Sequence, residues 1–236
     1  MTPLVLCYGG TFDPVHTGHL AIARAVRDAL HADVHLLPAA DPPHKGPTHA
    51  DAADRARMLE LAVDGEHGLV VDRRELLRDG PSYTVDTLRG LRAELGPHAP
   101  IVWMVGGDSV FGLATWHRWR SLFDFAHVLA IARAGAPIER DALAARAPEV
   151  HAEVEPRWCL PSQLHALPAG GFAEFRLARE RPESSTTLRQ WIAAGDPRWR
   201  AWVAPGVADY IERTGLYDGR PGAADAFTPT AGDGLV

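Results

Sequence analysis

The chain has 236 residues, of which 46% are hydrophobic and 23% are charged, and these values are ordinary for a globular protein that buries a sizeable core. Its formal net charge of −6 argues against a general nucleic-acid binder, because there is no basic excess to neutralise a phosphate backbone. With two cysteines, no apolar run near the roughly 18 residues of a membrane span and no signal-peptide pattern, we expect a cytoplasmic protein with no membrane partner and no disulfide framework.

Apolar runs with the composition of buried strands recur along the chain. They span residues 4–8, 34–37, 69–71, 101–105, 127–132 and 173–177. Helical apolar periods lie between them, at about residues 18–30, 51–63, 84–94 and 140–146. This alternation predicts right-handed βαβ units. We therefore expect a Rossmann-like, doubly wound α/β fold, with a mostly parallel sheet and helices on both faces.

The alternation continues far enough to predict a single domain over residues 1–217. Within it, residues 148–172 carry scattered proline, glycine and tryptophan with little periodicity, and we expect an irregular excursion there. Residues 218–236 contain few large apolar side chains, which predicts a disordered tail. Open parallel sheets bind ligands at the carboxyl ends of their strands, so the segments that follow strands are the candidates for a site.

The segment after the first predicted strand, GGTFDPVHTGHL at residues 9–20, is the most informative part of the chain. Gly9 and Gly10 form a turn into a helix, whose N-terminal amides point at an anion. His16 and His19 lie on one face of the helix start, and the glycine between them lets a ligand approach the backbone. The pattern predicts a nucleotide site of the HxGH type, with histidine donors in place of a Walker lysine. An ordinary strand–turn–helix junction is the alternative.

The loop after the second predicted strand carries two adjacent prolines, which stiffen it and fix where His44 and Lys45 emerge. An imidazole and an ammonium at a strand end suit a polyphosphate, although an ordinary solvated loop is an equal alternative. Arg55, at the start of the next helix, is expected on a solvated helix face.

Two further segments have chemistry that fits a nucleoside. Ser82 or Thr84 could cap the helix that follows them, and the N-terminus of that helix could hold a carboxylate. Asp108 follows a strand and a glycine pair, where a carboxylate can accept hydrogen bonds from a ribose. In the aromatic turn beyond it, Trp116 could stack on a planar ring, with His117 beside it; a buried core tryptophan is the alternative.

Near the end of the chain, a serine-rich segment opens another helix. Ser184, Ser185 and Thr186 can cap that helix or present hydroxyls to a ligand. Arg189, one turn further on, carries a planar guanidinium suited to phosphate oxygens. Capping alone explains the serines equally well, and the phosphate interpretation depends on the pairing with the HxGH turn.

Together these segments resemble those of bacterial nicotinate-nucleotide adenylyltransferases, members of the HxGH nucleotidyltransferase superfamily. The motifs that carry the resemblance are GGTFDPVHTGH, PPHK, PSYT, GGDS followed by LATW, and SSTTLR, and the resemblance as a whole extends over residues 4–217. The first motif is specific to the superfamily, and PPHK, SYT and TW point to this family within it. The resemblance implies adenylyl transfer from ATP to nicotinate mononucleotide in NAD biosynthesis, giving deamido-NAD and pyrophosphate, with Mg²⁺ bound to the ATP. A homo-oligomer is compatible with it.

The resemblance also implies a role for each matched residue. His16, His19 and Arg189 would be catalytic through contacts with the phosphates, without any protein nucleophile. Asp108 would bind a ribose, Trp116 would stack on the pyridine ring, and backbone amides around Thr84 and His117 would receive the nicotinate carboxylate. The remaining residues expected to bind ATP and its phosphates are Gly9, Gly10, Thr11, His44, Lys45, Ser184, Ser185 and Thr186.

One position departs from the family pattern: Glu183 stands where an apolar residue is usual, which places an acid near the expected triphosphate site.

Two other functions remain to be weighed. Phosphopantetheine adenylyltransferases share the N-terminal signature and a C-terminal serine motif, but the SYT and TW segments and the chain length speak against them. A non-catalytic nucleotide-binding module would be expected to have lost some of the histidines, the lysine or the arginine.

Overall fold

The computed structural model describes residues 3–40, 48–78, 80, 82–132 and 137–219. Within these residues, seven strands form one sheet in the order β3-β2-β1-β4-β5-β7-β6, and every neighbouring pair is parallel. The strands are β1 (Val5–Gly10), β2 (Val34–Pro38), β3 (Leu69–Val71), β4 (Ile101–Gly106), β5 (His127–Ala132), β6 (Trp158–Cys159) and β7 (Phe172–Arg176). The predicted α/β fold with a parallel sheet is thereby confirmed.

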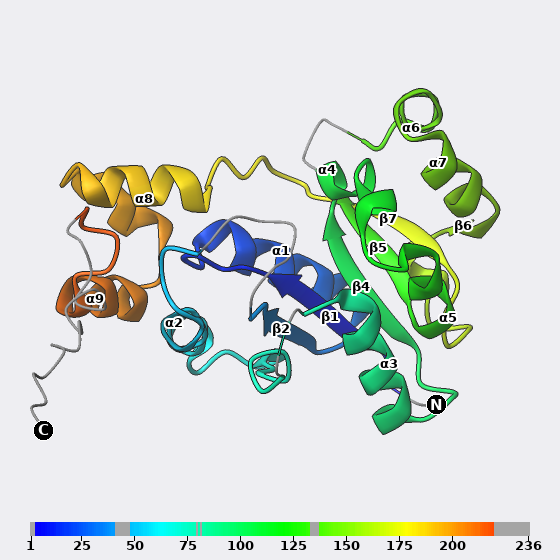
Figure 1. The fold of residues 1–236 in the computed structure, drawn as a ribbon, viewed down its shortest axis with the longest axis horizontal. Helices are drawn as coiled ribbons and strands as arrows, with labels where there is room; N and C mark the ends of the chain where they lie inside the picture. Colours follow the sequence, from blue (N-terminus) through cyan, green and yellow to red (C-terminus); the bar gives the residue numbers. More distant parts are fainter. Residues whose placement is uncertain (1–2, 41–47, 79, 81, 133–136, 220–236) are drawn as a thin grey trace, which may run out of the picture.

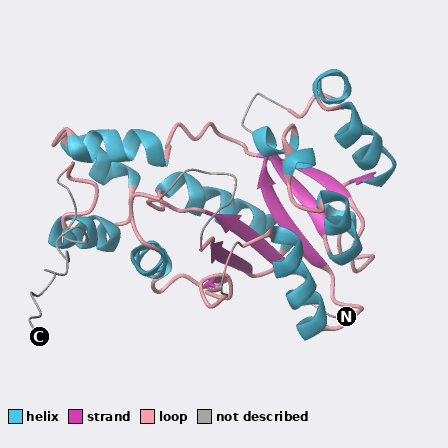
Figure 2. Cartoon of the chain, in the orientation of Figure 1, coloured by secondary structure: helices cyan, strands magenta, loops and turns pink. Residues whose placement is uncertain are grey.

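Helices cover both faces of the sheet, as Figure 2 shows. One face carries α1 (Thr17–Leu30) and α2 (Ala52–Val63), and the same apolar core extends to α8 (Ser185–Ala193) and α9 (Pro205–Thr214), with α9 packed against α2 (Figure 1). The other carries α3 (Thr84–Leu95), α5 (Leu122–Phe125), α6 (Arg140–Arg146) and α7 (Pro148–Val154), and the short helix α4 (Gly107–Val110) follows β4 directly (Figure 1). Among the described residues, no helix is both long enough and apolar enough to span a membrane.

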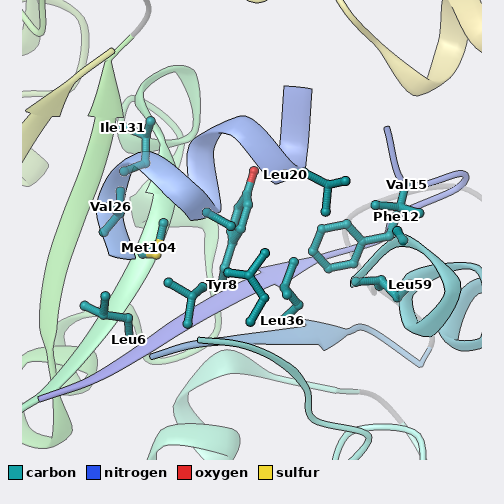
Figure 3. Packing of buried hydrophobic residues seen from close by; sticks show 14 of the residues in the cluster. Leu6, Tyr8, Phe12, Val15, Leu20, Val26, Leu36, Leu59, Met104 and Ile131 are labelled. Carbon is teal, nitrogen blue, oxygen red and sulfur yellow. The ribbon is translucent and has the colours of Figure 1, made fainter. Parts of the chain in front are cut away.

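The strands bury both of their faces because their side chains alternate between two cores. Leu6 and Tyr8 of β1 pack into the core beneath α1, whereas Cys7 faces the core beneath α3. Figure 3 shows the first of these cores, where Leu20 of α1 lies close to Tyr8 and Met104 of β4 lies on the same side of the sheet. The two cores hold β1 and β4 rigidly side by side.

The strand order places a topological switch at the centre of the sheet. From β1 the chain moves to β2 and β3 on one side, and it then returns to β4 on the other side of β1. The loops that leave β1 and β4 therefore diverge, and the carboxyl ends of these two strands open into a crevice. Gly10 and Gly106 are the last residues of the two strands.

The stretch 148–172 differs from our expectation of an irregular excursion. It contains α7, the edge strand β6 and the first residue of β7. Val150 and Val154, one helical turn apart, are fully buried, and Pro148 starts the helix at a position where it needs no backbone N–H. An apolar period this short is hard to detect in sequence.

The predicted disordered tail lies outside the described residues, apart from residues 218 and 219.

Candidate functional site

Two neighbouring cavities open at the carboxyl edge of the sheet. The larger one has a volume of about 580 Å³, and the smaller one of about 250 Å³. Both are lined by Gly9, Gly10, Thr11 and Gly106, so the ends of β1 and β4 form their common floor. A ligand with two parts can therefore extend from one cavity into the other across these glycines.

The glycines are required by the packing beneath them. A Cβ atom on Gly9 would overlap the Trp103 indole of β4, and a Cβ atom on Gly10 would lie 2.8 Å from Cζ of Phe12. These aromatic rings pack directly against the backbone of the turn on its buried side. Only glycine allows this approach, and it leaves the backbone of the turn open to both cavities.

The two histidines of the HxGH turn cap helix α1 reciprocally. The backbone N–H of His19 donates to Nδ1 of His16 at 3.3 Å, and the backbone N–H of His16 donates to Nδ1 of His19, also at 3.3 Å. Their rings are stacked with centroids 3.6 Å apart. Because each Nδ1 accepts a hydrogen bond, each neutral ring carries its proton on Nε2. The turn thus presents imidazole N–H donors without needing a positive charge.

The two rings are not equally accessible. His19 lines the larger cavity, whereas His16 is buried behind it. Burial lowers the pKa of His16 to about 4, although the negative charge of Glu183 acts in the opposite direction. His16 is therefore neutral at pH 7, and the geometry makes it the support for His19.

Asp13 ties the turn to three distant parts of the chain. Its carboxylate is only 5% exposed and accepts hydrogen bonds from the backbone N–H of His49 (2.8 Å), the backbone N–H of Ala50 (3.1 Å) and the hydroxyl of Tyr217 (2.8 Å). Its backbone carbonyl accepts a hydrogen bond from Nη1 of Arg189 at 2.5 Å. Burial and the charge of Asp13 both raise the pKa of Tyr217, so its hydroxyl stays a donor.

Arg55 does not lie on a solvated helix face, as we had expected. Its side chain is fully buried, and its guanidinium donates to the carbonyls of Thr11 (2.8 Å), Ala39 (2.7 Å), Ala40 (2.8 Å) and Ala50 (3.3 Å). These carbonyls come from loops that meet at the start of α2. The several N–H donors of one guanidinium bond all of them, which a solvent-facing position would not allow.

Helix α8 brings the serine-rich segment to the HxGH turn. Ser184 caps the helix by accepting the backbone N–H of Thr187 at 3.1 Å, and Ser185 donates its hydroxyl to the carbonyl of Pro14 at 2.9 Å. Ser185, Thr186 and Arg189 line the larger cavity. The capping interpretation is confirmed for Ser184, while a phosphate contact of this residue stays a prediction.

Glu183 is directed at helix α1 and is not one of the residues that line the larger cavity. Its side chain is 8% exposed, and Oε1 accepts a hydrogen bond from the hydroxyl of Thr17 at 3.0 Å. Oε2 is buried and has no hydrogen-bond partner among the described residues. Helix α1 has no acid in its own first turn, so Glu183 supplies the negative charge that its N-terminus favours.

The smaller cavity lies at the N-terminus of α3. Tyr83 is the N-cap residue and makes no side-chain capping bond, so neither Ser82 nor Thr84 caps the helix as we had considered. Tyr83, Thr84, Trp116 and His117 all line this cavity, and the rings of Tyr83 and His117 lie 4.3 Å apart. The combination of an uncapped helix N-terminus and a half-buried indole suits a planar ring that carries an anionic group.

The structure brings most of the predicted residues together. The larger cavity is lined by Gly9, Gly10, Thr11, His19, Ser185, Thr186 and Arg189, and the smaller one by Thr84, Trp116 and His117 as well as the three turn residues. His16 and Ser184 lie behind the cavity walls, and Asp108 is exposed on α4 without lining either cavity. His44 and Lys45 lie outside the described residues.

Several polar residues line the two cavities although the sequence did not indicate a ligand-binding role for them. Thr48 and His49 line the larger cavity, while Glu75, Ser82 and Ser109 line the smaller one. Glu75 is buried, accepts the Thr87 hydroxyl at 2.7 Å, and has its pKa raised by burial. Thr48, His49 and Glu75 belong to no spacing pattern that indicates a ligand, so only their positions in the fold reveal them. Ser82 and Ser109 belong to the PSYT and GGDS motifs, but neither serine was predicted to bind a ligand.

Comparisons with known proteins agree with this geometry. The model of the cytidylyltransferase-like family matches residues 7–190. A probable nicotinate-nucleotide adenylyltransferase of Stenotrophomonas maltophilia is 49% identical, covering 92% of this chain and 98% of that relative, and one of Laribacter hongkongensis is 45% identical, covering 89% and 92%. The structure of Plasmodium falciparum nicotinic acid mononucleotide adenylyltransferase complexed with NaAD superposes with a TM-score of 0.70 at 15% identity, covering 92% of this chain and 98% of that one. At that identity the likeness concerns the fold alone.

Proposed function

We propose that this chain, which belongs to the nicotinate-nucleotide adenylyltransferase family, transfers the adenylyl group of ATP to nicotinate mononucleotide and releases pyrophosphate. The product is deamido-NAD, an intermediate of NAD biosynthesis. The observation that carries the proposal is the pair of joined cavities: one is lined by donors suited to a polyphosphate, and the other by groups suited to an aromatic acid.

The larger cavity is the proposed triphosphate site. His19 offers its Nε2, Arg189 a guanidinium, Thr186 a hydroxyl, and Ser185 and Thr186 the backbone amides of the α8 N-terminus. Arg189 is already bonded to the Asp13 carbonyl, so it is held in place before a ligand arrives. Donors fixed in this way lose little conformational freedom when charge develops on the phosphates. We retain His44, Lys45 and Ser184 as further candidates for this site and Asp108 as the candidate for a ribose.

The smaller cavity is the proposed pyridine site. The backbone amides at the start of α3 would receive the nicotinate carboxylate, and Trp116 would stack on the ring. Glu75 lines the same cavity and burial raises its pKa, while the positive end of the α3 helix dipole attracts an anionic group. This environment favours the acid over the amide.

The reacting phosphates would meet on the common floor formed by Gly9, Gly10, Thr11 and Gly106. There the phosphate of the mononucleotide attacks the α-phosphorus of ATP in line, and pyrophosphate leaves into the larger cavity. The reaction needs no protein nucleophile, so the protein contributes positioning and neutralisation of charge in the transition state. Each well-placed donor of this kind is typically worth about 3–4 kcal/mol.

Mg²⁺ belongs to the proposal as a companion of the ATP substrate. Among the described residues, no three histidine, cysteine or acidic side chains lie together in a way that could hold a metal ion. The carboxylate of the larger cavity, Asp13, already accepts hydrogen bonds from two backbone amides and Tyr217. We therefore propose that Mg²⁺ enters with ATP, because this cation is usually bound through substrate phosphates with only one or two protein carboxylates.

The proposal is tested by measuring pyrophosphate release with ATP and Mg²⁺, offering nicotinate mononucleotide and nicotinamide mononucleotide in parallel reactions. We expect strong release with the acid and much weaker release with the amide. Release with neither substrate would contradict the proposal. Turnover of phosphopantetheine would then favour a phosphopantetheine adenylyltransferase. ATP binding measured by calorimetry, without turnover, would favour a non-catalytic nucleotide-binding module.

Two further features belong to the same proposal. We place the protein in the cytoplasm, because the reaction draws on ATP, and fractionation of cells followed by the pyrophosphate assay tests this location. A homo-oligomer remains a proposal as well, and light scattering of the purified protein measures it.

A further inference from the structure

A second histidine faces the larger cavity beside His19, without belonging to the HxGH turn. His49 lies just before helix α2, and it lines this cavity together with Thr48, His19 and Arg189. Its side chain is 59% exposed, so the ring is accessible to a ligand that enters. His49 belongs to no motif that could be recognised in the sequence.

Asp13 fixes the position of His49 in two ways. Its Oδ2 atom accepts the backbone N–H of His49 at 2.8 Å, and the same oxygen lies 3.4 Å from Nδ1 of the ring. An ionised carboxylate can only accept hydrogen bonds, so its nearness favours the form of the ring that carries a hydrogen on Nδ1. The other nitrogen, Nε2, is left for a ligand.

This arrangement is the reverse of that in His16 and His19. Those rings use Nδ1 as an acceptor and carry a hydrogen on Nε2, so His19, which lines the cavity, can donate to phosphate without a positive charge. A neutral His49 with its proton on Nδ1 would present a lone pair at Nε2, which repels a phosphate oxygen. His49 can donate to a phosphate only as an imidazolium, with protons on both nitrogens.

We propose that His49 is a further triphosphate-binding residue, oriented by Asp13, that takes up a proton when a triphosphate enters the larger cavity. The proposal rests on the proposed function, because it assumes that this cavity receives the phosphates of ATP. An imidazolium between the Asp13 carboxylate and a polyanion is stabilised from both sides.

Other charged or titratable groups around the ring do not cancel this attraction. Arg189 lines the same cavity and opposes a second cation there, but its Nη1 is bonded to a carbonyl and lies 4.0 Å from Asp13. Nδ1 of His19 accepts the backbone N–H of His16, so that nitrogen carries no proton. Tyr217 donates to the other oxygen of Asp13, and Asp51, two residues after His49, is engaged in capping α2.

The experiment measures proton uptake on binding of a non-hydrolysable ATP analogue to the full chain. Calorimetric titrations at pH 7.5 in two buffers with different ionisation enthalpies give the number of protons taken up. Wild type is compared with His49→Gln and with the control His98→Gln, an exposed histidine just before β4, at the opposite edge of the sheet. Circular dichroism confirms that each variant is folded.

We expect His49→Gln to take up fewer protons than wild type and to bind the analogue about tenfold more weakly, equivalent to about 1.4 kcal/mol. His98→Gln should match wild type in both respects. His49→Lys, which carries a fixed positive charge, should recover most of the affinity while remaining deficient in proton uptake. Weaker binding by His49→Gln with unchanged proton uptake would overturn the proposal, as would unchanged binding.

The pyrophosphate assay separates this proposal from the proposed function. If wild type turns over nicotinate mononucleotide and His49→Gln keeps its affinity for the analogue, only the role of His49 is refuted. If wild type fails to turn over either mononucleotide, the proposed function fails, while proton uptake still reports on His49.

Discussion

Replacing Arg55 by methionine should lower the free energy of unfolding more than the same replacement of any exposed arginine. The guanidinium is fully buried and donates at 2.8, 2.7 and 2.8 Å to the carbonyls of Thr11, Ala39 and Ala40, which come from loops at the ends of β1 and β2. Methionine has a similar length and fills part of the space. It offers no donor, so these carbonyls lose their partner.

The size of the effect follows from these three bonds. A buried acceptor left without its partner costs about 1–3 kcal/mol, which gives an upper range of about 3–9 kcal/mol for three carbonyls. Removing the guanidinium also removes the cost of burying its charge, and water can enter at the loops. We therefore expect the free energy of unfolding to fall by about 2–4 kcal/mol.

Urea unfolding followed by tryptophan fluorescence measures this change. Arg57→Met is the matched control, because Arg57 lies on the same helix with its side chain 51% exposed, and its loss should cost no more than about 0.5 kcal/mol. A loss below about 1 kcal/mol for Arg55→Met, with an unchanged denaturant slope, would refute the argument that these carbonyls depend on the guanidinium.

Three other predictions concern the site itself. His19→Ala should lower kcat about 10²–10³-fold in the pyrophosphate assay while the circular dichroism spectrum is unchanged, and near-normal turnover would remove His19 from the mechanism. The pKa of His16 is lowered to about 4 in the folded protein, so the unfolded chain protonates this side chain at a higher pH than the folded protein does. The free energy of unfolding should therefore decrease as pH falls from about 6.5 to 4, by at most about 3 kcal/mol. Urea titrations across this range should show a smaller decrease for His16→Gln, and equal decreases would contradict the assignment. Tyr217→Phe removes one donor to Asp13 and should cost about 1 kcal/mol in thermal unfolding, with Tyr210→Phe, which loses a bond to the N-cap region of α2, as a comparison.

The parts of the fold that could be predicted from sequence are those that depend on local patterns. The strands of residues 69–71 and 127–132 lie where the apolar runs predicted them. All residues of the second strand are buried, and a parallel strand covered on both faces has to be mostly apolar, whereas the first is an edge strand with Val70 exposed. The HxGH turn could be predicted as well, since the glycines and histidines that form it are close together in the sequence. The joined cavities then follow from the strand order.

The parts that could not be predicted depend on contacts between distant segments. Arg55 has the sequence context of a surface arginine, and its burial results from carbonyls that only the folded loops bring to it. His49 likewise becomes part of the site through Asp13, which lies 36 residues earlier. Glu183 stands out in sequence as an unusual acid, but its partner, the hydroxyl of Thr17, is visible only in the structure.

The hydrogen bond between Tyr217 and Asp13 also determines when the site can form during synthesis. The two residues are 204 positions apart, and Arg189 lies 176 positions after Asp13. Nascent chains emerge from the ribosome at roughly 5–20 residues per second, N-terminus first. The histidine turn is thus exposed to the cell for some ten seconds or more before α8 and Tyr217 arrive to complete it. A prematurely terminated chain that ends before these residues carries the most recognisable motif of the protein and still has no assembled site.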